Sequence, residues 1–179
     1  MTTNELRKNI ILLREVLDEK TVLANSQKVT AALFSTDGFL SHDSYFVYKS
    51  FRGEIDTGEI IARLTRLNKT LLFPVTVGNE LIAALPTGNQ TTRDKFGVEI
   101  PLYYTEFNCP DVTIVPLVAC DERGNRVGFG KGYYDRFFTK NECLKIGVCH
   151  DFQVVSELAP KPWDIPLDLI ITEKRVILP

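Results

Sequence analysis

The chain has 179 residues, of which 44% are hydrophobic, and this length and composition suit one globular domain with a substantial core. Its formal net charge of -2 argues against the extended basic surface that holds a nucleic-acid backbone, so we expect no nucleic-acid partner. Charged residues interrupt the apolar ones throughout the N-terminal segment, which argues against a signal peptide or a membrane span and favours a cytoplasmic protein.

The cysteines and histidines are scattered along the chain. The cysteines are Cys109, Cys120, Cys143 and Cys149, the histidines are His42 and His150, and no C-x-x-C pair occurs. Buried, reduced thiols are the simplest interpretation, with a zinc site or disulfides as the alternatives.

Two amphipathic patterns predict helices at the start of the chain. Apolar residues recur at helical spacing among charged ones at Leu6, Ile10, Leu13 and Leu17, and a second helical run covers residues 22–34. Further on, Asp56 and Glu59 have the spacing of a capping box ahead of another apolar helical pattern. We therefore expect a third helix that Asp56 caps.

Segments rich in apolar, β-branched and aromatic residues predict the strands of a sheet. They cover residues 43–50, 70–75, 80–85, 112–120, 144–150 and 167–173. Pro116 predicts an irregularity in the fourth of them, because proline cannot donate to a strand ladder, and the polar stretch 89–95 is a candidate mobile loop. Apolar strands that alternate with amphipathic helices predict an α/β layered domain over residues 1–179, with a mainly parallel, Rossmann-like central sheet flanked by helices.

A glycine-rich stretch, GNRVGFGKGYYDRF, runs from Gly124 to Phe137 between a predicted strand and a predicted helix start. Alternate glycines let a backbone approach an anion closely, and Lys131 and Arg126 add positive charge. The spacing is neither that of a Walker A loop nor that of a dinucleotide-binding loop, and a plain solvated turn is the alternative. Asp135 beside such a loop indicates a bridging Mg²⁺ if a phosphate binds, or else an ordinary acid in the first turn of a helix.

Several motifs in this order resemble the 5-formyltetrahydrofolate cyclo-ligase family. They are R-x-G-x-G-K-G-Y-Y-D from Arg126 to Asp135, L-R at Leu6 and Arg7, E-x-D-T from Glu54 to Thr57, F-G-V at residues 96–98, a strand that ends in Asp121, and W-D-x-x-L-D-x-I-I-T-E from Trp163 to Glu173. The motifs span nearly the whole chain. The resemblance implies an ATP- and Mg²⁺-dependent ligase that converts 5-formyltetrahydrofolate to 5,10-methenyltetrahydrofolate, with ADP and phosphate as the other products and a phosphorylated formyl group as the intermediate.

The resemblance also implies roles for individual residues. The implied catalytic residues are Lys131, Arg126 and Tyr133. The implied ATP-binding residues are Thr3, Asn4, Arg7, Arg126, Gly128, Phe129, Gly130, Lys131, Gly132, Tyr133 and Tyr134. The implied folate-binding residues are Arg7, Glu54, Phe129, Gly130, Lys131, Gly132 and Tyr133, and the implied Mg²⁺ ligands are Asp135 and Asp164.

Each of these residues also has a purely structural interpretation. Taken alone, Arg7 is a solvated helix residue, Glu54 a loop acid, Trp163 a partly buried anchor, and Asp164 and Asp168 are turn and strand-start acids. Only the joint pattern favours the site.

The sequence departs from the family pattern at three places. Thr3 stands where the family usually has a lysine, Phe129 stands where an arginine is common, and Ile100 stands where an acid often precedes the proline, Glu99 lying one place early. We expect weaker ATP affinity from the first two departures.

Two other functions stay open at this point. A nucleotide- or anion-binding protein without catalysis would explain the departures, and a sugar-phosphate isomerase or hydrolase can use a similar α/β scaffold. The partners that the resemblance implies are the small molecules 5-formyltetrahydrofolate and ATP, and we expect a monomer or weak homodimer.

Overall fold

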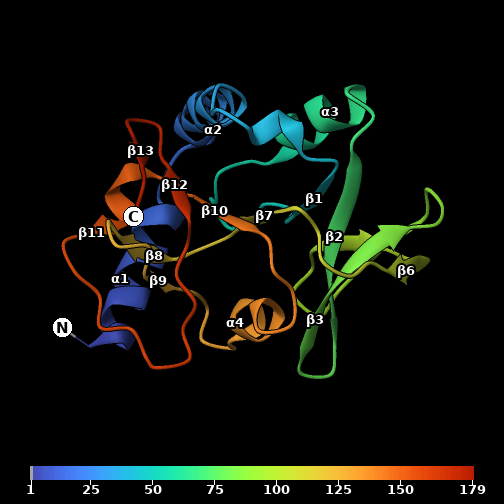
Figure 1. The fold of residues 1–179 in the computed structure, drawn as a ribbon. Helices are drawn as coiled ribbons and strands as arrows, with labels where there is room; N and C mark the ends of the chain where they lie inside the picture. Colours follow the sequence, from blue (N-terminus) through green and yellow to red (C-terminus); the bar gives the residue numbers. More distant parts are fainter. Residues whose placement is uncertain (1) are drawn as a thin grey trace.

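The computed structural model, which describes residues 2–179, contains four α-helices and thirteen strands in that part of the chain (Figure 1). The helices are α1 (Thr3–Glu15), α2 (Glu19–Phe34), α3 (Gly58–Arg66) and α4 (Tyr133–Phe138), with 3-10 turns η1 (Phe39–Ser41) and η2 (Asp151–Gln153). The first seven strands are β1 (Ser44–Val47), β2 (Thr70–Val77), β3 (Glu80–Pro86), β4 (Thr91–Arg93), β5 (Glu99–Pro101), β6 (Tyr104–Glu106) and β7 (Val112–Val115). The others are β8 (Ala119–Asp121), β9 (Arg126–Val127), β10 (Leu144–Val148), β11 (Val154–Val155), β12 (Leu169–Ile171) and β13 (Val176–Ile177).

The central sheet has eight strands in the order β13-β12-β10-β7-β1-β2-β3-β6. Its middle strands, from β12 to β2, are parallel, and β13, β3 and β6 add antiparallel edges. The register places Tyr45 of β1 beside Val112 of β7 and Leu71 of β2. The predicted α/β architecture with a mainly parallel central sheet is confirmed.

Successive side chains of β1 point to opposite faces of the sheet and fill two different core layers. Tyr45 belongs to the layer that includes Val29 of α2 and Ile60 of α3. Phe46 belongs to the other layer, where its ring centroid lies 4.9 Å from that of Phe137 in α4. Figure 1 shows α2 and α3 together along one side of the sheet and α4 on the other. Because both faces are covered, most residues of the middle strands are apolar, with exceptions such as Thr113 and Lys145.

The irregularity predicted at Pro116 ends the central strand. The segment expected as one strand divides into β7, which stops at Val115, and β8, which joins a separate sheet in the order β11-β8-β9. Proline has no N–H to donate, so the ladder is interrupted where the chain changes sheet. The small sheet carries β9, the strand that leads into the glycine-rich loop.

Three local expectations are wrong or incomplete. The polar stretch 89–95 contains β4, which pairs with β5 as an antiparallel hairpin, so part of the predicted mobile loop is regular structure. The N-cap of α3 is Thr57 and no side chain caps it; the Asp56 carboxylate instead accepts a hydrogen bond from the Gly58 N–H at 2.8 Å. In α1 the buried positions are Leu6, Ile10 and Arg14, spaced four apart, whereas Leu13 is exposed.

All four cysteines are free thiols, and the prediction that they are buried is wrong for Cys109, which is exposed. Cys120 and Cys149 are buried, with sulfurs 3.8 Å apart, and Cys143 is half-buried. Among the helices of residues 2–179, none is both long enough and apolar enough to pass through a membrane.

Candidate active site

One cavity of about 750 Å³ draws its lining from segments far apart in the sequence. It is lined by α1 at Thr3 and Arg7, by the loop after β1, by the β4–β5 hairpin, by the glycine-rich loop, and by residues 158–164. Every residue for which the resemblance implies a role lines this cavity except Asn4. The Asn4 side chain instead accepts a hydrogen bond from Arg7 Nη1 at 2.6 Å, and so holds a residue that does line it.

The glycine-rich loop lies directly against Arg7. Arg7 Nε donates to the Gly128 carbonyl at 2.8 Å, and a Cβ placed on Gly130 would lie 3.4 Å from Arg7 Nη2. Gly130 (φ +90°) and Gly132 (φ +64°, the N-cap of α4) have left-handed backbones that a side chain would strain, whereas Gly128 does not. Glycine at 130 therefore serves both the turn and the close contact with the arginine.

The surroundings of the loop differ in part from the expected strand, loop and helix. The helix is present as α4, but it has only six residues. As expected, the buried strand β8 and a turn precede the stretch, but the stretch itself also contains β9, a strand of two residues that pairs antiparallel with β8. The dipole of a helix as short as α4 contributes little positive potential at the loop, so cationic side chains must contribute most of it.

Lys131 supplies one such cation. It is exposed, lines the cavity, and makes no hydrogen bond or ion pair with any residue between 2 and 179. Its ammonium group is therefore available to an anionic ligand.

Arg126 and Asp135, both implied site residues, are paired with each other. Arg126 Nη2 lies 2.6 Å from Asp135 Oδ1, and Arg126 Nη1 donates to the Ile165 carbonyl. The Ile165 N–H donates to the same Asp135 oxygen at 3.2 Å. The Arg126 side chain is only 6% exposed. The pair explains how an acid is tolerated beside the loop without a metal, which the sequence interpretation of Asp135 did not foresee.

Asp135 and Asp164 nevertheless suit a magnesium ion that also binds phosphate. Both line the cavity, and Asp164 Oδ2 accepts a hydrogen bond from the Lys161 N–H at 2.8 Å. In each carboxylate the second oxygen has no hydrogen bond within the described part of the chain. That part contains no cluster of three or more His, Cys, Asp or Glu residues that could hold a metal. Mg²⁺ commonly uses one or two carboxylates together with phosphate oxygens and water, so two acids fit the donor set.

At another part of the cavity lies a buried acid, Glu54, which is 7% exposed. Its Oε2 accepts a hydrogen bond from the Phe51 N–H at 3.0 Å, and its Oε1 lies 3.5 Å from Arg14 Nη1. Burial raises the pKa of Glu54 to about 7, and Arg14 and the Phe51 N–H only partly offset that effect. The cavity thus contains a carboxyl group that titrates near neutral pH.

Aromatic side chains form part of the wall. Phe129 is 47% exposed, and the Tyr133 hydroxyl lies 3.3 Å from Lys95 Nζ, which comes from the β4–β5 hairpin. Trp163 is 65% exposed, so the interpretation of it as a partly buried anchor is wrong. These three aromatic residues line the cavity, and aromatic rings of this kind can stack with a planar ligand.

Asp168 lies outside the cavity, as its structural interpretation predicts. Its Oδ2 accepts a hydrogen bond from the Lys145 N–H at 2.8 Å and pairs with Lys145 Nζ at 2.7 Å. The pairing joins the starts of β10 and β12.

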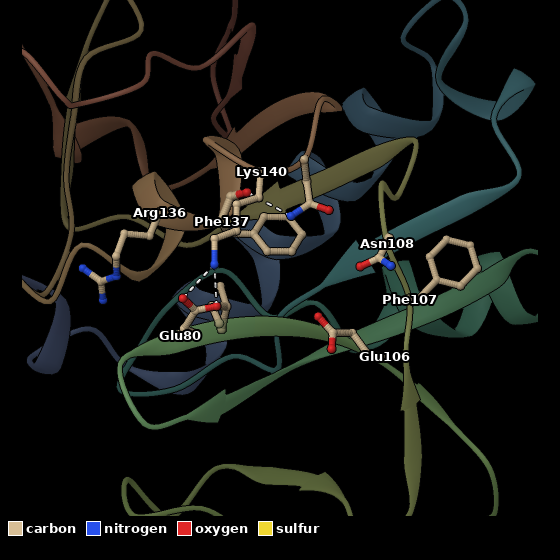
Figure 2. A pocket seen from close by; sticks show the side chains of 9 residues that line it. Glu80, Glu106, Phe107, Asn108, Arg136, Phe137 and Lys140 are labelled. Atoms are coloured by element: carbon tan, nitrogen blue, oxygen red, sulfur yellow. Dashed lines mark hydrogen bonds and ion pairs between the residues drawn. The ribbon is translucent and has the colours of Figure 1, made fainter.

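A second, smaller pocket of about 140 Å³ lies between α4 and β3 and contains no implied site residue. Figure 2 shows Lys140 reaching Glu80 there, and the two charges are 2.7 Å apart. Both side chains are more than half exposed, so the pair belongs to the solvated surface.

Sequence reasoning missed Arg14 and the β4–β5 hairpin as parts of the site. Arg14 is fully buried although its position among charged residues suggested the solvated side of α1. The hairpin contributes Asp94, Phe96 and Val98 to the cavity. The only signal for Arg14 was its spacing of four from Ile10, which an alternative apolar position, Leu13, obscured.

Comparison with known proteins identifies the family. The model of the 5-formyltetrahydrofolate cyclo-ligase family matches residues 1–173. The chain belongs to this family. The cyclo-ligase of Escherichia coli K12 is 35% identical over 141 residues, which cover 73% of this chain and 78% of the relative. That of Mycoplasma genitalium is 32% identical over 178 residues, covering 94% and 96%.

Solved structures of cyclo-ligase relatives have the same fold. The 5,10-methenyltetrahydrofolate synthetase of Aquifex aeolicus superposes with a TM-score of 0.88 at 34% identity, covering 99% of this chain and 93% of that one. The synthetase of Mycoplasma pneumoniae gives a TM-score of 0.78 at 28% identity, covering 97% and 99%. As a member of the cyclo-ligase family, the chain is an enzyme, an ATP-dependent ligase of folate metabolism.

Proposed function

We propose that this chain catalyses the ATP- and Mg²⁺-dependent cyclisation of 5-formyltetrahydrofolate to 5,10-methenyltetrahydrofolate, with release of ADP and phosphate. The observation that supports it best is that one cavity holds both the glycine-rich loop with Lys131 and the buried acid Glu54. A folate and a nucleotide can therefore meet in a single space. Since lining residues come from Thr3 to Asp164, we also propose that residues 1–179 act as one catalytic domain.

The two substrates use different parts of the cavity in this proposal. The Glu54 carboxylate accepts hydrogen bonds from the N–H donors of the pterin ring, whose face packs on Tyr133 and Phe129. The phosphates of ATP lie on the backbone of Gly128 to Gly132, where Lys131 supplies a mobile positive charge.

The reaction begins with phosphoryl transfer to the formyl oxygen. That oxygen attacks the γ-phosphorus, the bond to the bridging oxygen breaks, and ADP leaves with the electron pair. Lys131 neutralises charge on the moving phosphoryl group, and the cavity holds the two reactants in line. When bound by Asp135 and Asp164, Mg²⁺ supplies further positive charge to the phosphate oxygens.

Ring closure follows from the resulting iminium phosphate. N10 of the folate attacks the former formyl carbon, the carbon–oxygen bond then breaks, and the phosphate leaves with the oxygen and the N10 proton. The residues of the cavity exclude water from the activated carbon and hold N10 near it.

Arg126 has a supporting part in this proposal. Two of its amino groups contact Asp135 and the Ile165 carbonyl, so we assign it to holding Asp135 in place. That role differs from the direct phosphate contact that the resemblance implies.

The test is to mix the purified protein with 5-formyltetrahydrofolate and MgATP and to follow the methenyl chromophore. We expect an absorbance increase that requires ATP and stops when the metal is chelated. A folded protein that binds ATP without producing the chromophore would instead support the non-catalytic nucleotide-binding function and refute the proposed reaction.

A further inference from the structure

Arg14 is a buried charge placed directly behind the cavity wall. It is fully buried and does not line the cavity, yet it contacts three residues that do. Its Nη1 lies 3.5 Å from Glu54 Oε1, and its guanidinium carbon lies 5.7 Å from the centre of the Phe129 ring. Arg14 Nε also donates to the Arg52 carbonyl at 2.9 Å.

Fold stability gives only part of the reason for an arginine at this position, through the bonds that Arg14 donates to the Arg52 carbonyl at 2.9 Å and the Leu117 carbonyl at 3.4 Å. Leu6 and Ile10, the other residues on the buried face of α1 toward its start, are aliphatic. Arg14 Nη2 is buried without a hydrogen-bond partner in residues 2–179. A buried unpaired donor destabilises a protein, and apolar side chains of similar volume often replace buried ion pairs without loss. The position therefore suggests a role in function.

The groups around Glu54 show what that role is. Besides Arg14, the titratable side chains that act on Glu54 or on Arg14 are Tyr48, Tyr134 and His150. Burial raises the pKa of both phenols and lowers the pKa of His150, whose Nε2 contacts the Gly53 carbonyl at 3.0 Å, so all three are neutral near pH 7. Arg14 is the only cation among them, and it opposes the protonation of Glu54 that burial favours more strongly than the Phe51 N–H does.

We propose that Arg14 is a positioning residue for folate recognition, which keeps Glu54 charged and oriented toward the cavity while its guanidinium supports Phe129 from behind. The proposal rests on the proposed role of Glu54 in binding the pterin. In its absence Glu54 is protonated at neutral pH, one of its oxygens becomes a donor, and the pterin N–H groups lose an acceptor.

The experiment measures the dissociation constant of 5-formyltetrahydrofolate without ATP, from pH 6 to pH 9, together with the KM for ATP. The variants are Arg14→Met, Arg14→Lys, Glu54→Gln and the double variant Arg14→Met/Glu54→Gln. Arg66→Met on α3, an exposed arginine outside the cavity, is the matched control. Circular dichroism below the melting temperature shows which variants are folded, and Arg14→Lys keeps the test informative if Arg14→Met does not fold.

For Arg14→Met we expect folate binding about tenfold weaker at pH 7, with the KM for ATP changed by no more than about threefold. The defect should shrink toward pH 9, because Glu54 ionises there without its partner. Arg14→Lys should recover part of the loss. In the double variant the two losses should not add, because both remove the same carboxylate contact.

Three results would overturn the proposal: a folate affinity of Arg14→Met equal to that of wild type at pH 7, a loss that is the same at every pH, or additive losses in the double variant. The Glu54→Gln variant distinguishes a wrong role for Arg14 from a wrong proposed function. If Glu54→Gln binds folate as well as wild type does, the role of Glu54 is wrong; if it binds weakly while Arg14→Met binds normally, only the role of Arg14 is wrong.

Discussion

Two parts of the cavity wall, a buried end around Glu54 and an exposed end around Lys131, differ in how their charges are arranged. At one end Glu54 is buried and already paired, with Arg14 Nη1 at 3.5 Å and the Phe51 N–H at 3.0 Å. At the other end Lys131 is exposed and has no partner among residues 2–179. The buried end is therefore organised before any ligand arrives, whereas the exposed end is completed only when an anion binds.

This difference suggests a division of work between recognition and chemistry. A preformed acid at fixed geometry contributes to binding the folate in the ground state and the transition state alike. A mobile cation can follow a phosphoryl group as it moves, and so contributes most where charge develops. Variants at the two ends should then have different kinetic signatures.

The largest expected effect is that of Lys131→Ala. We expect kcat to fall by about 100-fold to 1,000-fold, because a charge is lost where the phosphoryl group moves, while the folate dissociation constant changes by less than about threefold. Steady-state kinetics and equilibrium binding measure the two quantities. Lys140→Ala, which removes an exposed lysine paired with Glu80 outside the cavity, is the matched control and should behave as wild type. Equal losses in rate and in folate affinity would show that the two ends do not divide the work.

The next effect is a pH dependence of folate affinity that comes from the buried end. Since burial raises the pKa of Glu54 to about 7, the carboxylate that accepts the pterin N–H groups forms as the pH rises through that value. We expect the dissociation constant of 5-formyltetrahydrofolate to be about tenfold higher at pH 6 than at pH 8. In Glu54→Gln the profile should be flat and the affinity low throughout. A wild-type profile without a step near pH 7 would contradict the assignment.

As the pH rises, ionisation of Glu54 should lower the free energy of unfolding, whereas it raises the affinity for folate. A raised pKa means that the folded state holds the proton more tightly than the unfolded state, whose Glu54 titrates near 4.5. The contribution of Glu54 to the free energy of unfolding is therefore greatest below pH 4.5 and declines as the pH rises to about 7. Denaturant unfolding of wild type and of Glu54→Gln across this range measures the difference, and the decline should be absent from the variant.

At the exposed end, Asp135→Asn should raise the Mg²⁺ concentration for half-maximal activity by several-fold, because a neutral amide is a weaker ligand for a hard cation. A Mg²⁺ titration at saturating ATP measures the shift. Asp168→Asn is the matched control, since Asp168 pairs with Lys145 outside the cavity. An unchanged titration would leave Asp135 only as the partner of Arg126 at 2.6 Å.

The sequence predicts the sheet and the glycine-rich loop well, for a physical reason. Strands covered on both faces are mostly apolar, as residues 144–150 are apart from Lys145 and His150, so the pattern can be recognised without knowledge of the packing. Glycines that need a left-handed backbone, such as Gly130 and Gly132, are also visible as residue types.

What the sequence did not predict depends on three-dimensional packing. The local sequence does not indicate that the Arg14 side chain is buried while Leu13, one residue earlier, is 51% exposed. The burial of Arg14 depends on its contacts with Glu54 and with the Leu117 carbonyl, which lie far along the chain. The ion pair of Arg126 with Asp135 was likewise not predictable, because a sequence shows two charged residues but not whether their side chains are in contact. The hairpin of β4 and β5 carries a polar strand with no apolar alternation, so its pattern resembled a loop.

The smallest expected effect comes from Thr3, where the family usually has a lysine. Thr3 lines the cavity at the first residue of α1, so Thr3→Lys places a further cation at the exposed end. We expect the KM for ATP to fall by about twofold to fivefold, the range that a solvated charge pair provides. The gain should diminish as salt is added, because exposed charges are screened, and the folate affinity should stay unchanged. Thr3→Gln is the matched control for side-chain length without charge. If the glutamine variant gains as much as the lysine variant, or if the gain persists at high salt, packing rather than charge limits ATP binding at this end of the cavity.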